Sequence, residues 1–428
     1  MRGVYVLLLI SLLGYAGRVS GQESVTITQC YEWARANYPQ IHQMGLIDQT
    51  ERYSLSNVGK AWLPQLSVSG KASYQSDVTK LPLDGDKISS LLPGFEIPSL
   101  SKDQYQVVAQ VDQTIWDGGS TRSARALTRA EAIANREQLE SELYALNDRV
   151  NQIYFGCLLQ DELIRQNALL QKELQVNIER IKAMMENGVA NQSDLESMEV
   201  ELLNARQNEI ELKTSRTVYR QMLATFINKP LTDQVVLKTP ESPERSLSTQ
   251  INRPELRALD AKSEWIETQN KQVTAGLMPR IGAFVQGGYG RPGLNMLEDS
   301  FEPYYVAGVR LSWNLGKLYT LKNDRRKIEV SRRQIDVQRE TFLFNTRLQL
   351  LQQNTEIKKM TDLMRADDDI IRLRTSIKQA AEVKLENGVI SVTDLIREIN
   401  AEDMARQTAA AHRVQRLMTI YNYMYTTN

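Results

Sequence analysis

Polar and apolar residues alternate strictly in four stretches of the chain. In the first stretch Leu66, Val68, Gly70, Ala72 and Tyr74 share one face, and the residues between them are polar. A period of two predicts β-strands, which we expect at about residues 64–75, 104–116, 279–290 and 303–313. Each run holds about 10–12 residues, the length of a strand that crosses an outer membrane within a barrel.

A different rhythm fills most of the remaining chain. Apolar residues recur at alternating steps of four and three, beginning with Leu139, Leu143, Leu146, Val150, Ile153 and Cys157. Sustained heptads predict helices that pack as coiled coils. We expect long helices at about 119–186 and 317–386 and shorter ones at about 193–228 and 393–426. At about 1.5 Å per residue the long helices would form rods on the order of 100 Å.

Two similar turns end the long helical segments. The letters Glu-Asn-Gly-Val occupy residues 186–189 and again 386–389. Glycine favours the left-handed conformation that ends a helix. The pairs Ser193-Asp194 and Thr393-Asp394 are expected to cap the helices that return. Each long helix is therefore predicted to fold back as a hairpin.

The turns belong to an internal duplication. Pro39 and Pro254 precede similar helical stretches, and Pro64 and Pro279 precede similar strands, in each case 215 residues apart. We therefore divide the chain into a first repeat, 22–228, a proline-rich linker, 229–250, and a second repeat, 251–428. The linker is expected to run around the middle of the helical structure.

Residues 1–21 are typical of a secretory signal peptide. Arg2 is followed by an apolar run that ends at Leu13, too short to span a bilayer, and then by small residues. Cleavage near Gly21–Gln22 would leave 50 basic and 52 acidic residues. No later apolar run reaches spanning length, and the mean hydropathy is −0.41, which argues against a helical membrane protein. Without clustered surplus positive charge, nucleic-acid binding is not expected.

Candidate chemistry is sparse. An exported chain could join Cys30 to Cys157, but the place of Cys157 on an apolar helical seam favours two separate buried thiols. His42 and His412 have no metal-ligand spacing around them, so we expect no metal and no cofactor. Nucleotide-binding loops and nucleophile motifs are not found, and we expect no enzymatic activity.

Aromatic residues gather at the ends of the predicted strands. Such girdles mark the two interfaces of a membrane barrel. A soluble, half-buried sheet would alternate in the same way, but the clustered aromatics and the export signal favour the membrane. One level carries Tyr74, Tyr105, Tyr289, Tyr304 and Tyr305, and the other carries Trp62, Trp116 and Trp313.

Four strands cannot close a barrel, because open sheet edges in hydrocarbon leave backbone groups unpaired at several kcal/mol each. Copies of the chain must therefore share one barrel. A dimer would give eight strands around a filled interior, and a trimer would give twelve. Only the larger ring leaves a pore that could continue into a helical tube.

The order of these segments resembles the TolC-type outer-membrane efflux family across the mature chain. The resemblance rests on "ITQCYEWARANYPQI", "RPELRALDA", "TIWDGG", and the two turns "NGV…SDL" and "NGV…TDL". It implies a homotrimer in the bacterial outer membrane, in which long coiled-coil helices form a periplasmic tunnel. Four strands per chain would contribute to a shared twelve-stranded β-barrel. It further implies a periplasmic adaptor that contacts Gly188, Val189, Ala190, Gly388, Val389 and Ile390, and an inner-membrane transporter.

The resemblance also implies an aperture near the turns, formed by Asp194, Asp394, Leu385 and Arg397. The chain departs from the family here. Asn187 and Asn387 stand where other members have valine, and Leu385 and Ile390 replace an aromatic and a basic residue. A lock built from the family's ion pairs is therefore not expected. Asp194 and Asp394 have two open interpretations, a ring that favours cations or ordinary helix capping.

Together these features predict the passive exit duct of a tripartite efflux or secretion system, opened at its periplasmic tip when partners dock. The main alternative is a structural or adhesive trimeric coiled-coil protein, which explains the heptads but not two aromatic-bounded strand pairs. A periplasmic adaptor would explain one helical hairpin but not the duplication. Neither the cargo nor the class of transporter follows from the sequence.

Overall fold

The computed structural model describes residues 24–79, 100–242, 248–296 and 298–428. These residues form two compact units, each taken from both halves of the sequence. The helical unit takes its described residues from 24–43, Gln138–Leu256 and Glu340–Asn428. The sheet unit takes its described residues from Met44–Glu137 and Arg257–Arg339. The predicted signal peptide lies outside the described residues. The division in space thus differs from the predicted division into sequence repeats.

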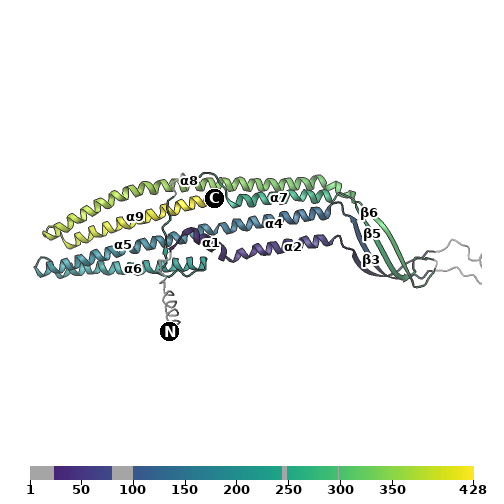
Figure 1. The fold of residues 1–428 in the computed structure, drawn as a ribbon, viewed down its shortest axis with the longest axis horizontal. Coiled ribbons are helices and arrows are strands. Elements are labelled where there is room, and N and C mark those ends of the chain that lie inside the picture. Colours follow the sequence, from purple (N-terminus) through teal and green to yellow (C-terminus); the bar gives the residue numbers. More distant parts are fainter. Residues whose placement is uncertain (1–23, 80–99, 243–247, 297) are drawn as a thin grey trace, which may run out of the picture. The chain divides into compact units, whose positions relative to one another are not determined.

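The sheet unit holds four antiparallel strands in the order β2-β3-β5-β6 (Figure 1). They are β2 (Gln65–Tyr74), β3 (Asp103–Trp116), β5 (Arg280–Arg291) and β6 (Glu302–Ser312). Each begins and ends within two residues of the ranges that the alternation predicts. Within the described chain, β2 and β6 each pair along one side only, so both edges of the sheet are open.

The register places most of the apolar residues of the four strands on one face. Val68 lies opposite Ala109, and Val111 lies opposite Val285. On the outer strand Tyr305 is 79% exposed. The opposite face carries polar groups, among them Gln110, whose amide donates to Asp112 Oδ2 at 2.7 Å. One apolar and one polar face suit a sheet that separates lipid from an aqueous interior.

Helices α2 (Gln43–Lys60), α4 (Ser120–Tyr144), α7 (Pro254–Ala275) and the first part of α8 (Leu318–Glu386) adjoin the strands in sequence. Arg136 of α4 forms an ion pair with Asp48 of α2 at 2.8 Å. The apolar contacts between α7 and α8 centre on Ile266, Ile328 and Ile335. None of the described helices has the length and apolarity that a membrane span requires.

The helical unit contains α1 (Ile27–Asn37), α5 (Leu146–Glu186), α6 (Gln192–Ile227), the rest of α8, and α9 (Val392–Thr427). The helical unit also contains a 3₁₀ helix, η1 (Pro39–His42), and two short strands, β1 (Ser24–Val25) and β4 (Val236–Leu237). The two strands pair in parallel. A further 3₁₀ turn, η2 (Leu315–Lys317), precedes α8 in the sheet unit.

The prediction of one continuous helix over about 119–186 needs a correction. The helix is interrupted at Ala145, between α4 and α5. Ala145 keeps right-handed helical angles, with φ −61° and ψ −17°, so the chain does not turn there. Beside it, the Tyr144 ring stacks on Tyr425 at 4.9 Å, and its hydroxyl donates to the Tyr425 carbonyl. The heptad pattern passes through the interruption because the backbone keeps its direction.

Both cysteines are free and fully buried in the core of the helical unit, as the sequence predicts. They lie with Tyr154 and Phe155 in one apolar cluster formed by α1, α5 and α6. Burial raises the pKa of each thiol to about 12, so neither is a reactive thiolate at neutral pH.

Candidate functional site

The two predicted turns are near copies of each other in three dimensions. Gly188 and Gly388 take positive φ angles of 74° and 68°. In the first turn Val189 N donates to Met184 O at 2.8 Å, and in the second Val389 N donates to Lys384 O at 2.9 Å. These bonds satisfy carbonyl groups that the helix end would leave unpaired.

The asparagine before each glycine also stabilises the helix end. Asn187 Nδ2 donates to Ala183 O at 2.8 Å, and Asn387 Nδ2 donates to Val383 O at 2.7 Å. This bond gives the asparagines a structural role at the positions where the sequence departs from the pattern of the family that it resembles.

The helices that follow begin earlier than predicted, which corrects the expected caps. Their N-caps are Asn191 and Ser391, which accept from the backbone N–H groups of Asp194 at 3.0 Å and Asp394 at 3.2 Å. Each aspartate in turn accepts from the N–H of its N-cap residue at 3.1 Å. Asp194 and Asp394 therefore complete capping boxes from the third helical position.

The adaptor-contact candidates fall into two groups. Val189 is 58% exposed and Val389 is 69% exposed, and each directly follows a glycine. Ala190 and Ile390 are partly buried against an apolar core that joins the two hairpins, α5–α6 and α8–α9. The turns therefore present one exposed valine each on a firmly packed base.

Leu385 belongs to that core, which corrects its place in the predicted aperture. It is 3% exposed and packs with residues of both hairpins, among them Ile181, Met198 and Leu395. A side chain enclosed in this way is not available to line an opening. Leu385 instead holds the end of α8 against its neighbours.

Charged groups surround the second turn. Arg397 pairs with Asp394 at 3.5 Å, and both side chains are exposed. The hydrogen bond from the Ser391 hydroxyl lowers the pKa of Asp394. Arg180 of the first hairpin approaches Glu386 of the second at 3.7 Å. These exposed pairs have small individual effects on stability.

A buried polar cluster, which sequence reasoning missed, lies further from the turns. Its centre is Glu402, 2% exposed, which accepts from Lys378 Nζ at 2.6 Å and from Thr375 Oγ1 at 2.6 Å. Lys378 also pairs with Glu173 of the first hairpin. These bonds lower the pKa of Glu402 to about 2 against the opposing effect of its burial. In the sequence, the residues of this polar cluster appear only as charged positions on helices with heptad repeats.

This polar cluster borders a cavity of about 430 Å³ between α5, α8 and α9. Asp403 lies on its wall. Burial, with the nearby charge of Glu173, raises the pKa of Asp403 to about 6. The region between the hairpins thus contains the ion pairs of Lys378 with Glu173 and Glu402, and the carboxyl group of Asp403, whose pKa is raised.

In the sheet unit the aromatic residues line the two ends of the strands, with one correction. Tyr305 and Tyr289 lie on the apolar face, whereas Tyr304 lies on the polar face, where its hydroxyl accepts from Gln106. Because side chains alternate along a strand, neighbouring tyrosines cannot share a face. The exposed aromatic residues of the predicted girdles are Trp62, Tyr74, Tyr105, Trp116, Tyr289, Tyr305 and Trp313.

Residues 30–229 match the family model described as Outer membrane efflux protein. The fold is similar to that of the CusC channel, with a TM-score of 0.67 and 13% identity over 94% of this chain and 92% of that chain. The MtrE channel of Neisseria gonorrhoeae gives a TM-score of 0.64 and 14% identity over 94% of this chain and 88% of that chain. The VceC protein of Vibrio cholerae gives a TM-score of 0.63 and 12% identity over 93% of this chain and 95% of that chain. No curated protein sequence matches the chain.

Proposed function

The chain belongs to the outer membrane efflux protein family, whose members are outer-membrane channels of tripartite efflux systems, and we propose how its duct is assembled, how it is closed and which surface its partners contact. Channels of this family are trimers, and their barrel forms only in the trimer. The observation that carries the proposal is the four-stranded sheet with two open edges and an exposed apolar face.

In the proposed assembly, β6 of one chain pairs with β2 of the next around the ring. Three copies give twelve strands and leave no edge in hydrocarbon. The polar face of each sheet then lines the channel, and the apolar face meets lipid. The alternative, an adhesive coiled-coil protein, does not explain why that apolar face is exposed.

We propose that the paired turns form the periplasmic end of the duct and that Val189 and Val389 contact the adaptor. Two exposed valines on stiff turns offer apolar contacts that lose little conformational entropy on binding. The charge around the second turn, from Asp394 and Arg397, would face the aperture. We further propose that an inner-membrane transporter supplies the energy, as the tripartite systems of this family imply.

Closure of the duct is proposed to depend on contacts between the two hairpins. The apolar core around Leu395 and the bonds of Lys378 to Glu173 and Glu402 join them. Opening would require these contacts to be exchanged for others, a change of a few kcal/mol that docking of a partner can supply.

Planar-bilayer recording of the detergent-extracted full chain tests the proposal. A duct gives discrete single-channel steps, and Lys378→Met increases the open fraction because it removes the cation between two carboxylates. Arg372→Met, which alters an exposed pair on the same helix, serves as the control and leaves the steps unchanged. Absence of any conductance from correctly inserted protein would favour the adhesive alternative.

A further inference from the structure

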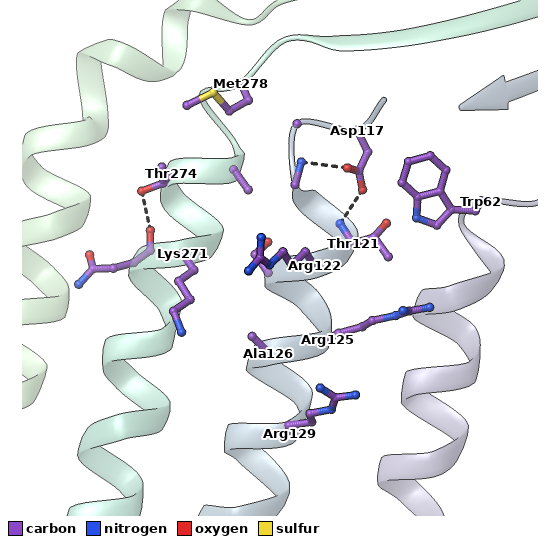
Figure 2. Close-up of a pocket in the computed structure, with 15 residues that line it drawn as sticks. Trp62, Asp117, Thr121, Arg122, Arg125, Ala126, Arg129, Lys271, Thr274 and Met278 are labelled. Atoms are coloured by element: carbon purple, nitrogen blue, oxygen red, sulfur yellow. Dashed lines mark hydrogen bonds between the residues drawn. The ribbon is translucent and has the colours of Figure 1, made fainter. Parts of the chain in front are cut away.

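A large basic cavity lies in the sheet unit where the strands give way to helices. It has a volume of about 960 Å³ and is walled by the ends of α2, α4 and α7. Figure 2 shows Arg122, Arg125 and Arg129 projecting from successive turns of α4, with Lys271 on the facing helix and Trp62 beside them. We call this the corner cavity.

The sequence "WDGG" shapes the corner next to the cavity. Gly118 and Gly119 take φ angles of 66° and 84°, which suit glycine. A Cβ atom at Gly118 would lie 2.5 Å from Met278 Cβ, so the chain can make this close turn only with glycine. The corner is therefore fixed, and it holds the first turn of α4 beside the end of α7.

The positive charge of the corner cavity is not neutralised. None of the four basic side chains has an ion-pair partner among the described residues, and all four are exposed. The one acidic group on the wall, Asp117, accepts from the N–H groups of Gly119 at 2.9 Å and Thr121 at 2.6 Å. Asp117 thus caps the helix, and the wall keeps a surplus of three positive charges.

Helix geometry places the arginine row on the side of α4 that faces away from the polar side of the sheet. Arg280, which lies on the polar face of β5, donates to Ser120 Oγ at 3.0 Å. Ser120 therefore marks the polar side of α4. Arg122 follows two residues later, about 200° further around the helix at 3.6 residues per turn. The arginine row thus points away from the polar side of α4, which is the side that would line the channel in the proposed assembly.

We propose that the corner cavity binds the phosphate-bearing headgroup of an anionic phospholipid from the periplasmic leaflet of the outer membrane. Arginine matches phosphate through paired N–H donors, and basic pockets at a membrane interface recognise anionic headgroups. Trp62 supplies an indole ring at the depth that tryptophan favours. The acyl chains would continue along the exposed apolar face, which contains Leu66, Val68 and Leu311.

This inference depends on the position of the sheet in the membrane and is independent of the proposed gate and adaptor contacts. It can be tested on the full-length assembled protein in detergent by native mass spectrometry. The probes are phosphatidylglycerol, phosphatidylcholine with the same acyl chains, and inorganic phosphate as a competitor. The readout is the number of lipids that each assembly retains as the detergent is washed.

The test variant replaces Arg122, Arg125 and Arg129 with glutamine. Its matched control replaces Lys322, Arg325 and Arg326, three exposed basic residues of α8 outside the cavity, so that the net charge changes equally. A second variant carries lysine at the three arginine positions and keeps the charge. Circular dichroism and the mass of the assembly establish that every variant is folded.

We expect the natural chain to retain phosphatidylglycerol over phosphatidylcholine, with affinity reduced at least tenfold in the glutamine variant. The lysine variant and the α8 control keep most of the binding. The proposal would be overturned if the glutamine variant retained as much phosphatidylglycerol as the natural chain, or if the α8 control lost as much of it as the glutamine variant. It would also be overturned if the natural chain bound both lipids equally. Displacement by millimolar inorganic phosphate would also overturn it, since the site would then recognise a free anion. Loss of conductance with lipid binding intact would instead count against the proposed duct alone.

Discussion

At the scale of single residues, protonation links pH to the contacts between the hairpins. Asp403 and Glu402 are neighbours in sequence, yet burial raises the pKa of the first to about 6, while bonds to Lys378 and Thr375 hold that of the second at about 2. The two pKa values differ because Glu402 is paired with the cation of Lys378, whereas the charged groups near Asp403 are Glu173, Glu402 and Arg406. The hydrogen-bond partner of Asp403 is Gln407.

The sign of each effect follows from linkage. An aspartate ordinarily releases its proton near pH 3.8, so between about pH 4 and 6 the folded state keeps a proton on Asp403 that the unfolded state has lost. Asp403 therefore makes folding less favourable as pH rises through this window. Glu402 acts in the opposite direction: its contribution is present above about pH 4.5 and is lost as pH falls toward 2.

We predict that Asp403→Asn raises the melting temperature at pH 7.5 and has little effect at pH 4.5. The reason is that the variant removes a carboxylate that is unfavourable only when ionised. Thermal melts monitored by circular dichroism across this range measure the difference from the natural chain. Asp368→Asn, at an exposed position of α8, is the control for the loss of one negative charge. A stabilisation that is equal at both pH values would contradict the assignment.

A second prediction separates the two interpretations of Asp394. Asp394→Asn removes the charge but keeps an oxygen that can accept from Ser391 N, whereas Asp394→Ala removes both. If capping is the main role, only the alanine variant lowers thermal stability, and cation preference in planar bilayers is unchanged in the asparagine variant. A clear loss of cation preference in Asp394→Asn would assign the residue to the aperture instead.

At the scale of secondary-structure elements, close approach of α5 and α6 depends on a glycine. Gly156 is the only glycine inside α5, and a Cβ atom there would lie 2.7 Å from Tyr219 Cε1. A glycine within a helix is normally unfavourable by roughly 0.5–1 kcal/mol relative to alanine. At this position the packing of the tyrosine ring outweighs that preference.

We therefore predict that Gly156→Ala destabilises the helical unit by about 1–3 kcal/mol, the usual range for overpacking. Gly45→Ala is the matched control, because no atom lies within 4 Å of a Cβ atom at that exposed helical position. It should be neutral or slightly stabilising. Chemical denaturation of both variants measures the change in free energy of unfolding, and a stabilising Gly156→Ala would show that Tyr219 moves away freely.

The turns are the second element-scale feature with a consequence for function. We predict that Val189→Asp combined with Val389→Asp abolishes export in cells that depend on this channel, because a charge on each exposed turn disfavours apolar docking. Val200→Asp, on an exposed part of α6, should have little effect. Drug or cargo sensitivity of the cells provides the measurement, with the amount of assembled channel in the outer membrane as a check. Unimpaired export in the double variant would exclude these valines as adaptor contacts.

At the scale of the whole molecule, the open edges of the sheet require other copies of the chain. We predict that electron microscopy of the detergent-extracted particle resolves a hollow assembly of three chains. Deletion of β6 should prevent assembly, since it removes both a strand and the edge for the next chain. A particle that contains a single chain, or that salt alone releases from membranes, would contradict the barrel.

Local patterns determined the elements of this protein. Strict alternation placed the four strands, heptads placed the long helices except for the interruption at Ala145, and the repeated Asn-Gly-Val placed the turns, because each property depends only on residues that are close in sequence. The sequence also predicted the two buried free thiols. The motifs in their order indicated the family.

Tertiary structure decided what depends on partners distant in sequence. Only the strand register assigns Tyr304 to the polar face, and only the packing of the hairpins encloses Leu385. Lys378 meets Glu173 across 205 residues of chain, and the corner cavity combines α2, α4 and α7. Periodicity specifies which face of an element is apolar, but the neighbour on that face is selected by packing in three dimensions. For that reason the sequence by itself determined the elements, and the structure was needed to show the sites between them.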